Sequence, residues 1–431
     1  MGLQVLASDK LLRMNNFSLL GMVQTHEVQA QTNATDVFEL GRTTKVDTAL
    51  ELETSGSLEL LSIGNTAGML ARMVVKRTAG AFVGFFYSGA GNKNNYCFTE
   101  ADLVDAQFDL VVYEKPDQLT FTRSMWLPRC FLTTISGRAE AGGLASETYS
   151  WGGQDLVGLE TPYHDIIATP CTVATSTTLT SSDATATSAN YTLLYVYVDD
   201  QRFRNNSTAD ATKFSHSGVT LTVVTTEGYT IPANAVCRAV FYKTTSPSTT
   251  FPTVTTTDRG TTAFYVRGAQ VNLFICPDDP DAPLASEKWL RVQSLDYTID
   301  LRSEQLRQLN FSQNGSSIYC RVPTLPFDIS VNASTYESDW LDWKAMINKT
   351  FPGNNVYEDS FDFNPNTMKG DAANPISAVL HYRTKGNALL QETQFTDLRL
   401  ESPAERTTVQ GRGEITWAFR GTALKICGYN V

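Results

Sequence analysis

The residues that could do chemistry are scattered along the chain. The four histidines fall on different predicted elements, and none has a metal-ligating partner at the spacing that zinc sites use: His26, His164, His216 and His381. No serine stands in a Gly-x-Ser-x-Gly elbow. The carboxylates Asp278, Asp279 and Asp281 cluster, but Pro280 interrupts them and the calcium-loop spacing is absent. We therefore predict no catalytic residue, no cofactor and no metal.

The cysteines carry no recognisable framework either. They are odd in number, widely spaced and never in Cys-x-x-Cys pairs: Cys97, Cys130, Cys171, Cys237, Cys276, Cys320 and Cys427. Such a pattern supports neither a zinc site nor a disulfide scaffold. The sequence predicts buried free thiols.

Composition limits the class of protein. The chain has 431 residues, 42% of them hydrophobic, with a net charge of -11. No apolar run is long enough to cross a bilayer and no signal peptide is present, so we expect a soluble product made in the cytoplasm. The negative charge argues against a surface that grips nucleic acid, because such surfaces match phosphates with Lys and Arg. It does not argue against DNA passing nearby.

The elements that must position any site are strands, and the clearest of them spans residues 292–302. Here Leu295, Tyr297 and Ile299 alternate with Asp296, Thr298 and Asp300, which predicts a strand with one polar face. A similar stretch lies 269 positions earlier (292 minus 23), where Glu27, Gln29 and Gln31 form the polar face. The sequence therefore predicts that the chain contains the same structural unit twice.

Further correspondences extend this duplication. Leu58-Glu59-Leu60 matches Phe327-Asp328-Ile329 at the same offset, and Asn65 matches Ser334, each as a candidate helix cap. Near the end of each copy, residues 149–153 match residues 417–421 at an offset of 268 (417 minus 149). The strictly alternating aromatic residues there predict buried core: Tyr149, Trp151, Trp417 and Phe419.

The predicted fold is mainly β, with two tandem units and an insert. Residues 1–163 and 267–431 form the two units, each a β-sandwich or half-barrel with one short helix. The second helix should follow Ser334, with Trp340, Trp343 and Ile347 on one face. Residues 164–266 are rich in Thr and Ser and poor in charge, and they predict an inserted immunoglobulin-like β-sandwich with threonine-rich flanks at 172–189 and 244–257.

This pattern resembles the tail-tube proteins of long-tailed bacteriophages. The residues that carry the resemblance are the segment KWLRVQSLDYTIDLRSEQLRQLN at 288–310 and the closing strand GRGEITWAFRG at 411–421. The resemblance covers about three quarters of the chain and implies a fused double-domain member of the family. It implies homotrimeric, pseudo-hexameric rings that stack into a tube in the virion tail, with the tape measure, tail terminator and tail tip as partners.

The resemblance also implies two sets of site residues. Polar residues should line the lumen and let DNA pass without specific binding: Glu27, Gln29, Gln31, Asp296, Thr298 and Asp300. Two polar loops should contact the adjacent ring through Arg42, Lys45, Asp47, Glu51, Asn314, Tyr319 and Arg321. Alternation alone leaves open which face of the strands lines a pore. The alternatives are a baseplate, tail-tip or host-binding fibre component that binds through the insert, and a glycan hydrolase, for which no carboxylate pair stands out.

Overall fold

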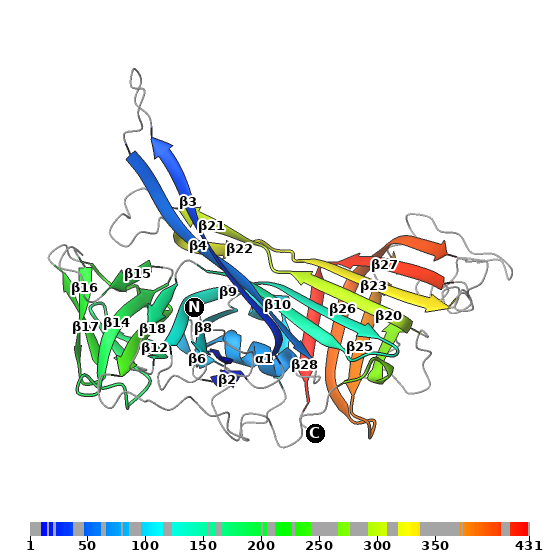
Figure 1. The fold of residues 1–431 in the computed structure, drawn as a ribbon, viewed down its shortest axis with the longest axis horizontal. Helices are drawn as coiled ribbons and strands as arrows, with labels where there is room; N and C mark the ends of the chain where they lie inside the picture. Colours follow the sequence, from blue (N-terminus) through cyan, green and yellow to red (C-terminus); the bar gives the residue numbers. More distant parts are fainter. Residues whose placement is uncertain are drawn as a thin grey trace, which may run out of the picture.

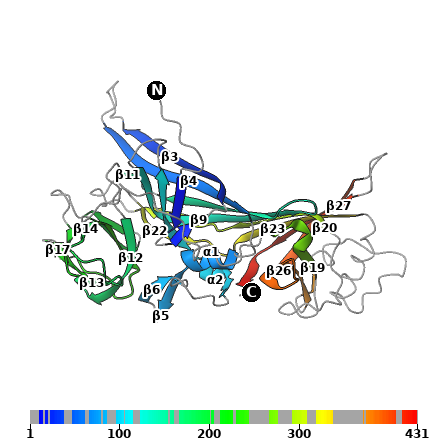
Figure 2. The ribbon, with the colours of Figure 1, turned by 60° about the horizontal axis from the view of Figure 1, so that its bottom comes forward.

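The computed structural model describes residues 10–14, 17–19, 23–37, 47–61, 66–78, 81–85, 96–104, 106–114, 123–153, 156–159, 166–199, 201–204, 212–225, 229–243, 266–275, 292–307, 318–336, 370–371, 374–406 and 414–429. Over these ranges the chain is mainly β, as predicted, and its strands pair antiparallel (Figure 1). The helices in the described ranges are α1 (Thr66–Met73) and α2 (Glu100–Leu103), which lie beneath the large sheet in Figure 2.

Two runs of six strands have the same order of pairing. The first run is β1 (Lys10–Met14), β8 (Gln107–Glu114), β9 (Arg123–Glu140), β10 (Ser146–Gly153), β4 (Asp47–Leu61) and β3 (Val23–Val37). The second run is β19 (Val271–Ile275), β25 (Asn374–Arg383), β26 (Leu389–Arg406), β27 (Glu414–Gly421), β23 (Asp328–Tyr336) and β20 (Val292–Asp300).

The irregularities of the two runs also coincide. The β3–β4 ladder shifts register between Val23 and Thr25, and the β20–β23 ladder shifts between Val292 and Ser294. Both shifts lie 269 positions apart (292 minus 23). Within the long strands β9 and β26, Arg129 has φ 51° and Asp397 has φ 54°, which are left-handed conformations that non-glycine residues seldom adopt. These two lie 268 positions apart (397 minus 129), so the predicted offsets hold at the level of individual β-bulges.

The two runs join edge to edge through β9 and β20. Thr134 to Glu140 of β9 pair with Asp300 to Ser294 of β20, which makes a continuous sheet of eight strands in the order β3, β4, β10, β9, β20, β23, β27, β26. A second junction pairs β7 (Tyr96–Thr99) with β28 (Ala423–Gly428), and a disulfide joins Cys97 to Cys427 across it. The prediction that all cysteines are free is therefore wrong for this pair, which the sequence separation of 330 conceals.

The remaining strands are short or form hairpins. They are β2 (Phe17–Leu19), β5 (Val75–Thr78), β6 (Ala81–Phe85), β11 (Val157–Leu159), β21 (Ser303–Arg307), β22 (Ile318–Pro323) and β24 (Gly370–Asp371). The pair β21–β22 continues the β20–β23 hairpin, just as β3 and β4 form one long hairpin. Both hairpins reach beyond the same end of the eight-stranded sheet (Figure 1).

One face of the eight-stranded sheet is the main hydrophobic core. The aromatic residues Tyr149, Trp151, Trp417 and Phe419 are all buried in it, which confirms the prediction that they are core residues. Helix α1 closes this core from below, with Ala67, Leu70 and Met73 fully buried. The face that α1 covers is thus the inner one, and the opposite face is polar.

The insert is a seven-stranded sheet in the order β15, β14, β18, β12, β13, β17, β16. Their bounds are β12 (Ile166–Thr175), β13 (Thr178–Ser181), β14 (Tyr191–Val198), β15 (Gln201–Arg204), β16 (Thr212–Ser217), β17 (Thr220–Thr225) and β18 (Cys237–Lys243). The sheet curls around its own core, because Phe203 of β15 packs on Phe214 of β16 with ring centroids 5.7 Å apart. The threonine-rich segment 172–189 is predicted to be a linker or edge, but it includes the end of β12, residues 172–175, and all of β13.

Two further predictions are wrong because the offset between the copies changes from 269 at β3 and β20 to 275 at β4 and β23. Ser334 lies within β23 and hydrogen-bonds to Ser294, so it caps no helix. The match of Leu58 to Phe327 is out of register, since Leu58 pairs with Tyr149 whereas Ala333 pairs with Trp417. The correct offset for this strand is therefore 275 (333 minus 58), because the second hairpin is longer. The second helix, predicted to carry Trp340, Trp343 and Ile347 on one face, lies outside the described residues.

Candidate assembly face

The exposed side of the eight-stranded sheet carries the residues predicted to line a pore. We call it the polar face. Its members alternate along each strand with core residues: Thr25, Glu27, Gln29, Gln31, Glu53, Ser55, Ser57, Glu59, Ser146, Thr148, Ser150, Thr134, Ser136, Arg138, Glu140, Ser294, Asp296, Thr298, Asp300, Asp328, Ser330, Asn332, Glu414, Thr416, Ala418, Arg420, Arg399 and Glu401.

The structure brings the predicted lumen-facing residues of both copies onto this one face. Glu27, Gln29 and Gln31 lie opposite Ser57, Ser55 and Glu53 in the β3–β4 ladder. We call the pairing of β9 with β20 the joint. Across it, Asp296, Thr298 and Asp300 lie opposite Arg138, Ser136 and Thr134 of β9. Because residues directly opposite in a ladder project to the same side of a sheet, the two sets share a surface although they come from strands 269 positions apart.

Around β3 and β4 the carboxylates are held by neutral donors. The Gln29 side-chain amide donates to Glu27 over 2.8 Å, and the Thr25 hydroxyl donates to Glu59 over 3.0 Å. At the joint, Arg138 pairs with Glu140 on its own strand and lies 3.8 Å from the Asp296 carboxylate across the ladder. Arg138 thus links the two runs electrostatically at the strand pair that joins them.

The second run differs, because arginines bridge its carboxylates from strand to strand. Arg302 lies 2.6 Å from Asp328 and 3.5 Å from Asp300. Arg420 lies 3.9 Å from Asp328 and 3.5 Å from Glu401, which in turn lies 3.1 Å from Arg399. We call Arg302, Arg420 and Arg399 the arginine ladder. All three are more than half exposed, so each pair contributes only about 0–1 kcal/mol.

The polar face is therefore mixed in charge and not uniformly acidic. Nine of its members are Asp or Glu and three are Arg, to which Arg302 adds a fourth. Alternation in the sequence places Arg302 on the polar side of the strand predicted at 292–302, but Arg138, Arg399 and Arg420 were not predicted to share that face. Their signal is visible in retrospect as alternation, for example Arg138 and Glu140 around the buried Ala139.

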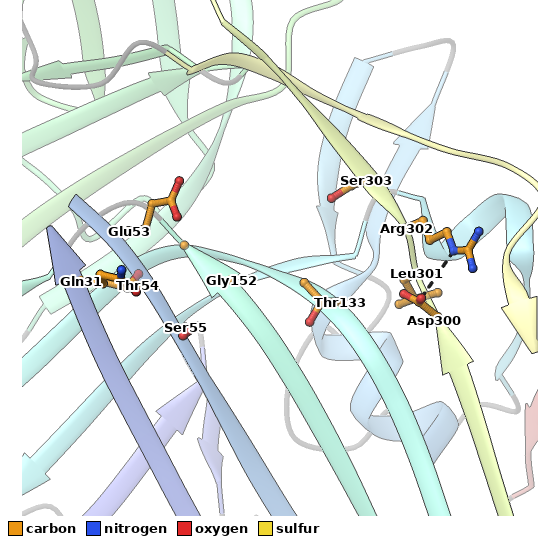
Figure 3. Close-up of a pocket in the computed structure, with 11 residues that line it drawn as sticks. Gln31, Glu53, Thr54, Ser55, Thr133, Gly152, Asp300, Leu301, Arg302 and Ser303 are labelled. Carbon is orange, nitrogen blue, oxygen red and sulfur yellow. Dashed lines mark hydrogen bonds and ion pairs between the residues drawn. The ribbon is translucent and has the colours of Figure 1, made fainter. Parts of the chain in front are cut away.

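A hollow of about 460 Å³ opens at the end of the polar face from which the two hairpins diverge. Gln31, Glu53 and Ser55 line it from β3 and β4, and Asp300, Arg302 and Ser303 line it from the other side, as Figure 3 shows. Gly152 and Thr133 form its floor between them. Its lining is polar, and the charges on its second wall are already paired with each other, so it resembles a junction between two hairpins more than a ligand site.

Beneath the joint, on the core side, lies a buried polar cluster made by both runs. The Tyr149 hydroxyl donates to the Glu147 carboxylate over 2.8 Å, and Tyr297 and Tyr382 come from the second run. Burial raises the pKa of Tyr149 and Tyr297 well above the usual value, and it also raises the pKa of Tyr382. Proximity to Glu147 raises the pKa of all three further, so these side chains are neutral parts of the core.

The insert is fixed to the first run by a buried ion pair. Arg238 of β18 lies 2.5 Å from Asp109 of β8, and both side chains are only 2% exposed. Asp109 also accepts the backbone N–H of Arg129 over 2.7 Å. An apolar cluster surrounds this pair, with Trp126 packed on Tyr195 at 5.5 Å between centroids. The insert is therefore packed against the first run and not held only by linkers.

The predicted loop residues are only partly described. Asp47 and Glu51 lie in β4, and Tyr319 and Arg321 lie in β22, so the expected polar loops include paired strands. Arg42, Lys45 and Asn314 lie outside the described residues. Of the cysteines, Cys130, Cys171 and Cys237 are buried and free as predicted, and burial raises the pKa of the Cys171 thiol to about 12.

In the described ranges, no group of three His, Cys, Asp or Glu side chains is placed to hold a metal ion. Among the same residues, none of the helices has the length and apolar character needed to span a bilayer. No protein-family model matches this chain, and no curated protein matches it.

Proposed function

We propose that this chain is a structural protein of the virion that forms the stacked rings of a phage tail tube. Each ring contains three copies, and their six strand runs form one continuous inner sheet around a bore through which DNA is delivered. The observation that supports this most is the repeated six-strand run together with the joint between β9 and β20. The proposal agrees with the resemblance in the segments 288–310 and 411–421.

The joint suggests how copies associate. In β9, the half that ends at Glu140 pairs with β10 on one edge and with β20 on the other. In β26, the matching half pairs with β27 on one edge, and among the described strands nothing pairs with its other edge. At the far end of the sheet, β3 pairs only with β4 among those strands. Unpaired edges attract further strands, and head-to-tail contacts that close give rings.

The polar face suits the wall of a DNA conduit. Its excess of carboxylates repels phosphates, and its Ser and Thr hydroxyls keep the surface hydrated. The arginine ladder does not reverse this, because each arginine is already paired with carboxylates of the same face. DNA would then pass without specific binding. Stacking of rings is assigned to the two hairpins, which reach beyond the sheet, and the tape measure, tail terminator and tail tip would be partners of the assembled tube.

The insert would lie on the outside of such a tube, since it packs on β8, which is not one of the eight strands that carry the polar face. A baseplate, tail-tip or fibre protein that binds a host through this insert is the alternative function. The rigid docking of the insert is compatible with both functions, so the shape of the assembly must distinguish them.

Electron microscopy and light scattering of the purified chain test the proposal. We expect trimeric rings that stack into hollow tubes as concentration rises. Single rings or trimers that never stack would favour the alternative, and a chain that stays monomeric at high concentration would contradict the proposal. A glycan-cleavage assay on the same sample would detect the enzymatic alternative.

A further inference from the structure

The pairing of β9 with β20 inside the chain defines a strand register. The same register can be applied to the edges of β26 and β3 that no described strand pairs with. Tyr149 pairs with Ile135, and Trp417 pairs with Pro403, so β9 corresponds to β26 at an offset of 268 (403 minus 135). The coinciding bulges show that β3 corresponds to β20 at an offset of 269. Within the chain, β9 and β20 pair with Thr298 opposite Ser136 and Asp296 opposite Arg138.

We infer that β3 of a second copy pairs antiparallel with the open edge of β26, in the register that sets Gln29 opposite Ala404 and Glu27 opposite Arg406. This inference rests on the proposed function and specifies its contact. Gln29 and Glu27 hold the positions of Thr298 and Asp296, while Ala404 and Arg406 hold those of Ser136 and Arg138.

Charge supports this register. The internal joint sets an arginine opposite a carboxylate, with Arg138 3.8 Å from Asp296. The transferred register again sets an arginine opposite a carboxylate, although neither Glu27 nor Arg406 was used to find it. Glu27 is exposed, and the Gln29 amide is its donor. Within the chain, Arg406 lies opposite Glu414 of β27. In the inferred contact, Glu27 of the next copy would bring a carboxylate to the ladder position opposite Arg406, as Asp296 does for Arg138.

The surrounding residues fit the same contact. A slip by one residue would turn the polar side chains of β3 toward the core side of the sheet, so the hydrophobic pattern allows only shifts by two. A shift by two would set Glu27 opposite Ala404 or position 408, and the ion pair would be lost. The pair of Glu27 and Arg406 therefore selects one register among those that the pattern permits.

A cysteine pair tests the register directly in the full-length chain. The variant Gln29→Cys with Ala404→Cys should form disulfide-linked oligomers on mild oxidation, which a reductant dissolves. Opposite residues in an antiparallel ladder have Cα atoms about 4.5–5.5 Å apart, within disulfide reach. The matched control, Gln31→Cys with Ala404→Cys, is shifted by one pair and should cross-link at least tenfold less. The unmodified chain, oxidised alike, reports any background from its own cysteines.

Charge reversal gives a second measurement by sedimentation velocity. Glu27→Arg or Arg406→Glu alone should weaken association about five- to tenfold, because like charges then face each other. The double variant should recover most of that loss. Lys385→Glu makes the same charge change in the exposed turn between β25 and β26 and should have no effect.

The outcomes separate this inference from the proposed function. Cross-linking at 29 and 404 with rescue by the double charge reversal supports the register. Rings that form normally, but neither cross-link at these positions nor respond to either reversal, would overturn the register and leave the tube proposal in place. An unmodified chain that never associates would overturn both.

Discussion

The two strand runs share their backbone and differ in their surfaces. Both place a left-handed residue at the same point of a long strand, Arg129 in one and Asp397 in the other. Yet Tyr113 and Ser124, which are opposite each other in the first run, correspond to His381 and Glu392 in the second. The first pair lies against the insert, whereas His381 and Glu392 form a buried pair with 3.0 Å between nitrogen and oxygen.

This difference between the runs indicates that strand order and bulges define the fold. The side chains at corresponding positions differ according to the part of the molecule that packs on them. A bulge changes the direction of a strand, so losing it would disturb every strand that follows. A surface residue has only to suit its neighbour. We therefore expect different losses from contacts that the two runs do not share.

The largest effect is expected where the first run holds the insert. Arg238→Ala leaves Asp109 buried without its ion-pair partner, and this should lower the free energy of unfolding by about 3–5 kcal/mol. Calorimetry would measure the loss, and limited proteolysis would show whether the insert detaches first. Arg399→Ala removes an exposed pair from the second run and should cost under about 1 kcal/mol. Equal losses in the two variants would contradict the assigned role of burial.

The next effect concerns the disulfide, which links β7 in the first half of the chain to β28 in the second half. Cys427 lies opposite Glu392, and Leu159 lies opposite Ser124, the residue of the first run that corresponds to Glu392. Leu159 thus takes the place of Cys427 in the first half of the chain, so the two halves differ here. Cys97→Ser should lower the free energy of unfolding by about 2–4 kcal/mol, because the lost crosslink frees a long loop of the unfolded chain. Thermal melting would show this, and a reductant should lower the melting temperature of the original chain but not of the variant.

A smaller loss is expected from crowding the joint between the runs. A Cβ atom on Gly137 would lie 2.3 Å from the buried Tyr297 ring, so Gly137→Ala should cost about 1–3 kcal/mol through overpacking. At Gly142, in the turn after β9, the added atom would meet nothing within 4 Å. Gly142→Ala should therefore leave denaturant midpoints unchanged. Tolerance of Gly137→Ala would argue against the tight fit of β20 on β9.

The smallest effect is a dependence of stability on alkaline pH. The buried tyrosines have pKa values raised by burial, so their contribution is complete below the unfolded value of about 10 and is lost as pH rises through the folded value. The melting temperature should fall between about pH 9 and about pH 11 as the unfolded chain loses protons. Tyr297→Phe should make that fall shallower, and an unchanged slope would show that this hydroxyl does not contribute.

Much of the strand content could be predicted from sequence because alternation reports directly on a half-buried strand. The strand predicted at 292–302 is β20 (Val292–Asp300), and the four core aromatics are buried. The sequence predicted the polar residues of β3 and of β20 as two separate groups, and not as one shared face. Their union depends on β9 pairing with β20, which no local pattern encodes.

The errors have physical causes. Ser334 precedes an amphipathic pattern, and the capping signal is the same in a strand that happens to end nearby, so sequence could not separate the two. Cys97 and Cys427 meet only because β7 of the first half adds to β28 of the second. The buried pair of Asp109 and Arg238 joins the insert to the first run. The two residues are far apart in the sequence, so no local motif or spacing predicts their contact.

The pairing of β7 with β28 has a consequence for how the chain is made. β7 leaves the ribosome 330 residues before its partner strand, and at about 5–20 residues per second this amounts to roughly 15–65 s of waiting. During that interval its backbone edge is available to the β28 of a neighbouring nascent chain. Crowded polysomes would then favour intertwined dimers, and slow, dilute synthesis would favour correctly folded single chains.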